Sequence, residues 1–311
     1  MTDNACAKNE LSLLGLVPQV LRARDFRLYT KDGRRLIDLW QNGGAAVLGH
    51  TPPLLLREIK NTASRGLYAP FPHFTEQRFI KALSQLLPGR SFRIYAAPPA
   101  GIQISQAGAI SGNADLASSA APDNAACLNA ALWRPFLDFC LPSQKPDAAQ
   151  KPAAPPLVIP ILPGVQGWRN GLPHGLCVCA VLPDFEERVF GALPPGDFLP
   201  PVLLAAAARG IWDLIAAAPV RANVQWQRVN AILKTSPWQR RGIYLFPRTA
   251  PAPEAWDALF RLFLDAGFLL PPLMEHPLIL PGILSPGEEA KLAAVLQITA
   301  GKGDQGLGIR E

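Results

Sequence analysis

Proline is the feature that most restricts how this chain can fold. The chain has 311 residues and 33 prolines, about twice the average share of roughly 5%. Seventeen of these prolines fall within residues 98–201. The proline ring lacks an N–H and fixes φ, so such a cluster interrupts long helices and the hydrogen bonds of central strands. The middle of the chain is therefore expected to consist of short elements joined by loops.

The composition excludes several classes of protein. Apolar residues make up 49% of the chain, enough for a sizeable core, and only 17% of residues are charged. Lysine and arginine exceed aspartate and glutamate by six, which suits a small anionic, phosphorylated or acidic ligand. The chain has no block rich in lysine and arginine of the kind that follows nucleic acid, so we expect no nucleic-acid partner.

Cysteine spacing and the polar start of the chain bear on location. The five cysteines, at 6, 127, 140, 177 and 179, form no CxxC pair and have no spacing typical of zinc ligands. An odd count without a secretory leader predicts reduced thiols in a cytoplasmic protein. Apolar runs such as Pro200–Ala208 are shorter than the roughly 18 residues that cross a bilayer, so we expect no membrane association. Cys177 and Cys179 are interpreted as apolar fillers of a buried strand, residues 176–182.

Regular patterns flank the proline-rich middle. Residues 26–40 alternate around Lys31-Asp32-Gly33 as a β-hairpin does. Helices are predicted from Thr51 (as N-cap), over 75–86, over 202–218 with an end at Pro219, over 253–266 and over 288–298. Short apolar runs at 157–162 and 176–182 predict buried strands. Strands and helices that alternate at both ends indicate an α/β or α+β protein. Three blocks are expected: 1–95 (arm, hairpin and helices), 96–203 (the proline-rich region) and 204–311 (a C-terminal α/β domain).

The segment 24–53 resembles the entry segment of the class III aminotransferases, which are pyridoxal-phosphate-dependent transferases of fold type I. The resemblance rests on Asp32-Gly33, Leu36-Ile37-Asp38, Gly43-Gly44 and Leu48-Gly49-His50, in that order. Within this family the chain is most similar to the glutamate-1-semialdehyde aminomutases, in segments 65–76, 200–215 and 267–276. The resemblance implies a reduced fold-type-I α/β protein, with a small domain formed by both chain ends beside an abbreviated large domain.

The same resemblance implies a cofactor lysine and a phosphate-binding turn, and neither is recognised. The lysine should lie some tens of residues before residue 202, yet the chain has no lysine between Lys151 and Lys234. Where the family binds the phosphate at a helix N-terminus, this chain reads Ala96-Ala97-Pro98-Pro99-Ala100-Gly101, and prolines remove the N–H donors. The partner of the pyridine nitrogen could at best be Asp184 or Glu186, and Pro183-Asp184-Phe185 does not keep the motif.

Three functional hypotheses follow, and the sequence leaves open whether the protein is an enzyme. The favoured one is a non-catalytic relative of the class III aminotransferases that acts in binding or assembly, as a homodimer or paired with an active relative. The alternative is an active pyridoxal-phosphate-dependent aminotransferase or aminomutase on amino-acid substrates, with an unrecognised lysine such as Lys145, Lys151 or Lys234. A third possibility is another small-molecule site in the altered middle of the chain, for an anionic ligand. No metal site is recognised. The candidates for lining a substrate pocket are Trp40, His50, Tyr68, Phe71, His73 and Glu275.

Overall fold

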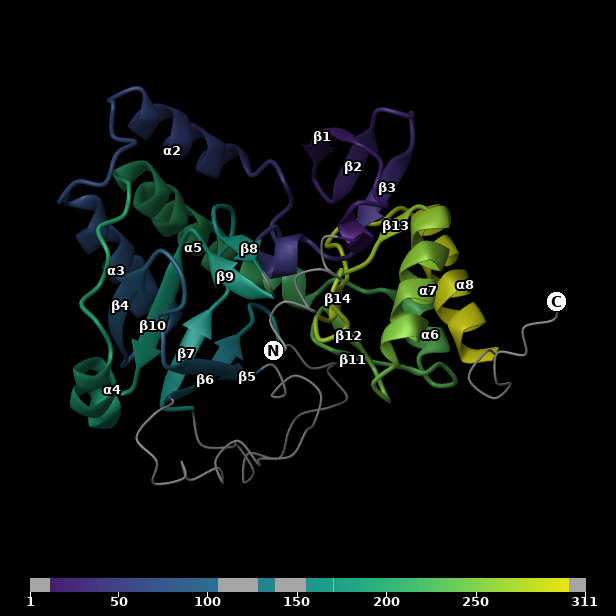
Figure 1. Cartoon of the computed structure of the whole chain (residues 1–311). Helices are drawn as coiled ribbons and strands as arrows, with labels where there is room; N and C mark the ends of the chain where they lie inside the picture. The colour runs from purple at the N-terminus through teal and green to yellow at the C-terminus, as the bar shows by residue number, and fades with distance from the viewer. Residues whose placement is uncertain (1–11, 106–127, 138–154, 170, 302–311) are drawn as a thin grey trace. The chain divides into compact units, whose positions relative to one another are not determined.

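The chain folds into two compact units in a computed structural model, which describes residues 12–105, 128–137, 155–169 and 171–301 (Figure 1). Unit 1 contains Met1–Gln41, Phe136–Phe139 and Pro219–Glu311, and unit 2 contains Asn42–Pro135 and Cys140–Ala218. The boundaries of these two units differ from those of the three blocks expected from the sequence. Lys145 and Lys151 lie outside the described residues.

Unit 2 is built on a five-stranded sheet of order β4-β10-β7-β6-β5. Its strands are β4 (Ser91–Tyr95), β5 (Ile102–Ser105), β6 (Leu128–Trp133), β7 (Leu157–Pro160) and β10 (Cys177–Val181). Strands β5, β6 and β7 are parallel, whereas β10 runs antiparallel to both β4 and β7. The two predicted buried strands are thus confirmed as β7 and β10, and every residue of both is buried.

Helices cover both faces of this sheet. They are α2 (Pro53–Ala63), α3 (Thr75–Leu86), α4 (Glu186–Ala192) and α5 (Pro201–Ala222), and the short helix η4 (Pro183–Phe185) precedes α4. Val178 packs with residues of α3 and α5 on one face, while Cys177 and Cys179 pack with Val189 of α4 on the other. A strand buried on both faces reads as a continuous apolar run, which is why the sequence revealed β10. The interpretation of the two cysteines as buried fillers agrees with their location.

The helix predicted to end at Pro219 continues past it. α5 ends at Ala222 and carries Pro219 near its end. A proline removes one helical N–H, and the side-chain amide of Asn223 donates to the Pro219 carbonyl (2.9 Å), so the last turn keeps a hydrogen bond. By length and composition alone, α5 is long and apolar enough to cross a membrane, and half of its most apolar stretch is buried inside the molecule.

The predicted N-cap of the first helix is also wrong. α2 begins at Pro53 after Pro52 as N-cap, and no side chain caps it. Proline at the first helical position needs no partner for its missing N–H and has the helical φ, so the two prolines start this helix without Thr51.

Unit 1 contains a four-stranded sheet, β1-β2-β3-β13, and a three-stranded sheet, β11-β12-β14. Its elements are β1 (Val20–Arg24), β2 (Arg27–Thr30), β3 (Arg35–Asp38), α6 (Gln227–Ile232), β11 (Trp238–Arg241), β12 (Tyr244–Pro247), α7 (Pro253–Asp265), β13 (Phe268–Leu269), β14 (Leu278–Ile279) and α8 (Pro286–Gly301). β2 and β3 confirm the predicted hairpin. β13 pairs with β3, Phe268 opposite Ile37, so both chain ends build one domain, as expected.

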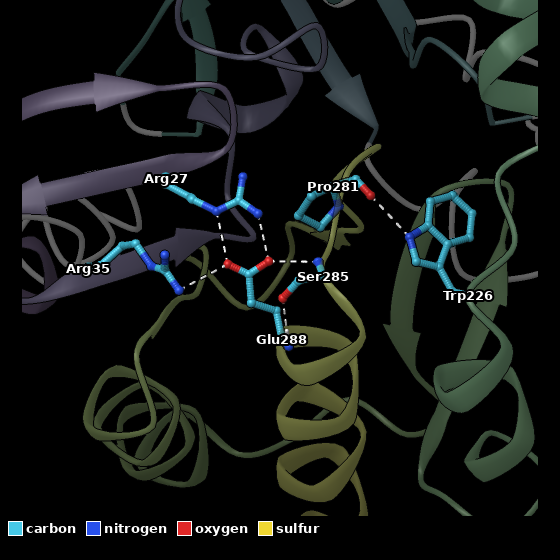
Figure 2. A network of polar contacts seen from close by, with 6 residues as sticks. All are labelled: Arg27, Arg35, Trp226, Pro281, Ser285 and Glu288. Carbon is cyan, nitrogen blue, oxygen red and sulfur yellow. Dashed lines mark hydrogen bonds and ion pairs between the residues drawn. The ribbon is translucent and has the colours of Figure 1, made fainter.

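A buried carboxylate fastens α8 to the hairpin within unit 1 (Figure 2). Glu288, 8% exposed, accepts two hydrogen bonds from Arg27, at 2.9 and 2.6 Å, and Arg35 lies 3.4 Å away. Ser285 precedes α8 as in a capping box: its N–H donates to the Glu288 carboxylate (2.8 Å), and its hydroxyl accepts the Glu288 N–H (3.2 Å). On the neighbouring segment, the indole of Trp226 donates to the Pro281 carbonyl (3.0 Å).

Candidate functional site

The topology of unit 2 indicates where a ligand site would lie. In open α/β sheets ligands bind outside the carboxyl ends of the parallel strands. In this sheet that edge is formed by the ends of four strands, at Tyr95, Ser105, Trp133 and Pro160. β10, which runs the other way, begins there at Cys177. We therefore treat this carboxyl edge as the first candidate site.

The connection from β7 to β10 folds over the carboxyl edge. It contains the two-stranded ribbon β8 (Gly167–Arg169) and β9 (Leu172–His174), which lies beyond the end of β7 (Figure 1). Gln166, almost fully buried, accepts the N–H of Leu162 (2.9 Å) and donates to the carbonyl of Leu176 (2.9 Å). One side chain thereby joins the end of β7 to the start of β10 and holds the ribbon in place.

A glycine-rich turn packs against this ribbon. The turn is η1 (Asn42–Gly44), and the Asn42 side chain donates to the Gln166 carbonyl (3.0 Å). Gly43 has φ +66°, and a Cβ added there would overlap the Trp168 indole. A guanidinium N–H of Arg134, itself buried, lies 3.5 Å from the Gly43 carbonyl oxygen. The glycines are therefore needed for close approach to Trp168, which fills the space beside the turn.

The described lysines do not suit a covalently held cofactor at this edge. Pyridoxal phosphate requires an amine for its Schiff base. The described lysines, Lys31, Lys60, Lys81, Lys234 and Lys291, all have exposed side chains. Lys60 and Lys81 lie on α2 and α3, and the other three belong to unit 1. None of them lies on the strands or turns that form the carboxyl edge of the described sheet.

The turn expected to bind the phosphate has a different structure. Residues 96–101 connect β4 to β5 directly, and no helix begins there. The N–H of Ala96 donates to Asp197 (2.8 Å), and Pro98 and Pro99 have no N–H. Asp184 follows β10, so it lies at the opposite edge of the sheet, where Glu186 accepts a hydrogen bond from the Ser91 hydroxyl. The described residues therefore do not fit pyridoxal phosphate.

The six candidate pocket residues fall in two units. Trp40 is half-buried in unit 1, where its N–H donates to Asp38 (2.9 Å), and Glu275 is exposed on a turn of the same unit. His50 is half-buried in unit 2 after the glycine-rich turn. Tyr68, Phe71 and His73 lie on one segment of unit 2, which precedes α3. The role of all six in a substrate pocket stays a prediction.

The segment before α3 is a second candidate site, because its aromatic side chains face solvent. Tyr68 is 71% exposed, Phe71 50% and Phe74 53%. His73 accepts the N–H of Thr75 (3.3 Å) and its ring lies 4.3 Å from that of Phe74. The N–H of Val202 donates to the Leu67 carbonyl (3.0 Å), which fixes the segment to the start of α5. Rigid exposed aromatics are typical of interaction surfaces.

Phe198 is a further exposed aromatic of unit 2, beside α3, and was missed by the sequence. It is 65% exposed and lines a cavity of about 230 Å³ together with Glu76 and Ile80 of α3. We call Tyr68, Phe71, Phe74 and Phe198 the aromatic surface. No local pattern links Phe198 to residues more than a hundred positions earlier. The described residues contain no cluster of histidine, cysteine, aspartate and glutamate able to hold a metal ion.

The buried thiols are not poised for chemistry either. The hydrogen bond to Cys179 and burial both raise the pKa of Cys177 well above its ordinary value. The thiolate is the reactive form of cysteine. Within the described core, Cys177 and Cys179 are thus packing residues.

Comparison with known proteins places the chain in a family. No known family profile matches it. An uncharacterized protein of Treponema pallidum (strain Nichols) is 30% identical over 287 residues, which is 85% of this chain and 89% of that protein. The chain belongs to the family of that protein. A glutamate-1-semialdehyde 2,1-aminomutase of Sorangium cellulosum is 33% identical over 69 residues, 22% of this chain and 16% of the aminomutase.

Solved structures identify the fold of this family member. The ornithine δ-aminotransferase of Plasmodium falciparum superposes with a TM-score of 0.60 over 97% of this chain and 99% of that chain, at 12% identity. The fold is that of the fold type I, pyridoxal-phosphate-dependent transferases. At this level of identity the likeness concerns the fold alone.

Proposed function

We propose that this chain is a non-catalytic relative of the class III aminotransferases, with a shortened and degenerate cofactor domain, that acts in binding or assembly. One observation carries the proposal: every lysine of the described residues is exposed and away from the carboxyl edge of the unit 2 sheet. An amine held at this edge is the group that the family's chemistry requires.

The closed carboxyl edge supports the same proposal. The Trp168 side chain fills the space beside the glycine-rich turn. The hydrogen bonds of Gln166 join the end of β7 to the start of β10. The prolines after β4 leave few N–H groups to bind a phosphate there. Among the described residues, this edge offers neither the amine nor the anion-binding turn that a pyridoxal-phosphate enzyme requires.

The test is to incubate the purified full chain with pyridoxal phosphate, reduce it with borohydride and map the peptides. We expect a flat absorbance spectrum and no lysine adduct beyond that of a denatured control. An absorbance band with stoichiometric labelling of one lysine would contradict the proposal and establish the alternative, an active enzyme. Lys145→Arg, Lys151→Arg and Lys234→Arg variants would then show which amine is labelled.

The assembly part of the proposal concerns the aromatic surface, which we assign to contact with a second copy of the chain. Covered phenyl and phenol rings bury about 150–250 Å² each. Four rings that are each half exposed or more therefore offer about 400–500 Å², a large part of the about 800 Å² that each partner contributes to a standard interface. The hydrogen bonds of His73 and Leu67 hold the segment in place, which lowers the entropy lost on association.

A further inference from the structure

A different surface, in unit 1, has the properties of an edge that accepts another strand. β1 pairs with β2 through Arg22 opposite Tyr29, Ala23 opposite Leu28 and Arg24 opposite Arg27, and the register shifts at Leu21 before Val20 pairs with Thr30. Among the described residues no strand pairs with its other side. In an antiparallel strand, alternate residues point their N–H and C=O groups to opposite sides. The outer side of β1 therefore carries backbone donors and acceptors that a further strand can use.

The side chains of β1 are exposed on both faces of the sheet. Val20 is 41% exposed and Leu21 68%, and Arg22 and Arg24 are exposed as well. Charged residues commonly protect edge strands from unwanted pairing. Protection of the edge explains why Arg22 and Arg24 are exposed. It does not explain the exposed aliphatic side chains of Val20 and Leu21, which a partner strand would cover.

The hairpin that contains β1 is strongly basic. Residues 20–35 include six lysines and arginines and two aspartates. Arg27 and Arg35 point toward Glu288 (Figure 2). The guanidinium of Arg22 lies 4.4 Å from the centre of the Tyr29 ring, which holds it in place. Arg22 is therefore an ordered positive charge along the open edge, and Arg24, whose guanidinium lies 3.9 Å from the Asp25 carboxylate, is an exposed one beside it.

The positive charge of Arg22 and Arg24 discriminates between the strands that could pair with the open side of β1. If two copies of β1 paired antiparallel about their centres, Arg22 would lie opposite Arg22, and like charges directly opposite one another destabilise a sheet. A strand with carboxylates two residues apart would instead pair with Arg22 and Arg24 and cover Leu21. We propose that β1 receives an extended acidic segment of another protein as an additional strand of the unit 1 sheet. This site is separate from the aromatic surface and does not depend on the absence of catalysis.

Binding of a labelled peptide to the full chain tests the proposal. The probe is fluorescein-Thr-Glu-Val-Glu-Val-Glu-Thr, followed by anisotropy at low and physiological salt. We expect saturable binding that weakens with salt. We also expect at least tenfold weaker binding of the matched peptide with lysine in place of glutamate. A peptide with proline in place of the two valines lacks two backbone N–H groups and should also bind at least tenfold more weakly, because strand addition depends on main-chain hydrogen bonds.

Matched charge reversals locate the site. The double variant Arg22→Glu, Arg24→Glu should weaken binding at least tenfold. The control, Arg57→Glu with Arg65→Glu, makes the same change of charge at exposed positions of unit 2 and should leave binding within twofold. Equal weakening by both pairs, equal binding of the proline peptide, or no binding of the acidic peptide would each overturn the proposal. A chain dimer that only Arg22→Glu, Arg24→Glu abolishes would assign β1 to a second copy and would overturn it as well.

Discussion

The carboxylate of Glu288 joins two parts of unit 1 that are far apart in the sequence. It accepts hydrogen bonds from Arg27 in β2 and from the Ser285 N–H before α8, with Arg35 of β3 nearby. Burial by itself raises the pKa of Glu288, but the bonds from Arg27 and Ser285 outweigh it and lower the pKa to about 2. The same bond raises the pKa of Arg27. Glu288 and Arg27 are therefore both charged in the folded protein.

Glu288→Gln should lower the free energy of unfolding at neutral pH by about 2 kcal/mol, since hydrogen bonds to charged groups contribute about 1.5–3 kcal/mol. The folded pKa lies below the ordinary value of 4.5, so the contribution is complete above pH 4.5 and is lost as the pH falls toward 2. Denaturant unfolding of both proteins from pH 7 to pH 2.5 measures the difference. Two stability curves that stay parallel over this range would show that the carboxylate is unimportant for folding.

Asp25 occupies a left-handed backbone conformation that an aspartate adopts at a cost. It is the first residue of the two-residue loop between β1 and β2, with φ +51°, and its exposed side chain lies 3.9 Å from Arg24. Exposed ion pairs contribute little. Asp25→Gly should raise the free energy of unfolding by about 0.5–1 kcal/mol because glycine adopts positive φ without strain. Asp25→Ala, which removes the same carboxylate, should not. The comparison is made by thermal and urea unfolding.

At the scale of elements, local signals were sufficient for most helices and insufficient for the sheets. The stripe of Phe79 and Leu83 on residues 75–86 predicted α3, and Gly267, with φ +83°, ends the segment after α7 as expected. The pairing of Ile37 with Phe268 joins residues 231 positions apart, and no local pattern contains such a register. α5 continues past Pro219 because the loss of one backbone N–H in the last turn of a helix costs little free energy.

The candidate site was likewise only partly predictable from the sequence. Tyr68, Phe71 and His73 share one short segment, so the sequence grouped them. Phe198 reaches the same surface through the fold, and Trp168 meets Gly43 through the ribbon over the carboxyl edge. Contacts of this kind depend on tertiary structure, which single-sequence patterns do not encode.

The contact between the glycine-rich turn and the ribbon gives a prediction at the element scale. Gly43→Ala should lower the free energy of unfolding by about 2–4 kcal/mol, because it combines overlap with Trp168 and a non-glycine residue at positive φ. In a Trp168→Ala background only the backbone part, about 1 kcal/mol, should remain. A double-mutant cycle by urea unfolding measures the coupling. Additive effects would show that the indole does not close this edge.

At the scale of the whole molecule, the chain has the fold of the fold type I transferases, and the described residues at the carboxyl edge of its unit 2 sheet pack against one another. Its described parts include the five-stranded sheet, the glycine-rich turn and a unit to which both chain ends contribute strands. What lies at the edge of the sheet is a tryptophan, a glutamine network and prolines. A fold by itself does not fix a function, and the aromatic surface of unit 2 is the one we assign to assembly.

Self-association of the full chain tests that assignment. We expect sedimentation equilibrium to show a monomer–dimer equilibrium. Truncating an exposed aromatic at the centre of an interface costs about 2 kcal/mol, so Tyr68→Ser and Phe198→Ser should each raise the dimer dissociation constant about thirtyfold. Both side chains are mostly exposed, so thermal unfolding of the dilute monomer should be unchanged. Ile283→Ser is the matched control, because it removes an aliphatic side chain that is 64% exposed in unit 1. A monomer at all concentrations, or a dimer that Ile283→Ser weakens as much as Tyr68→Ser, would exclude this surface as the contact between copies.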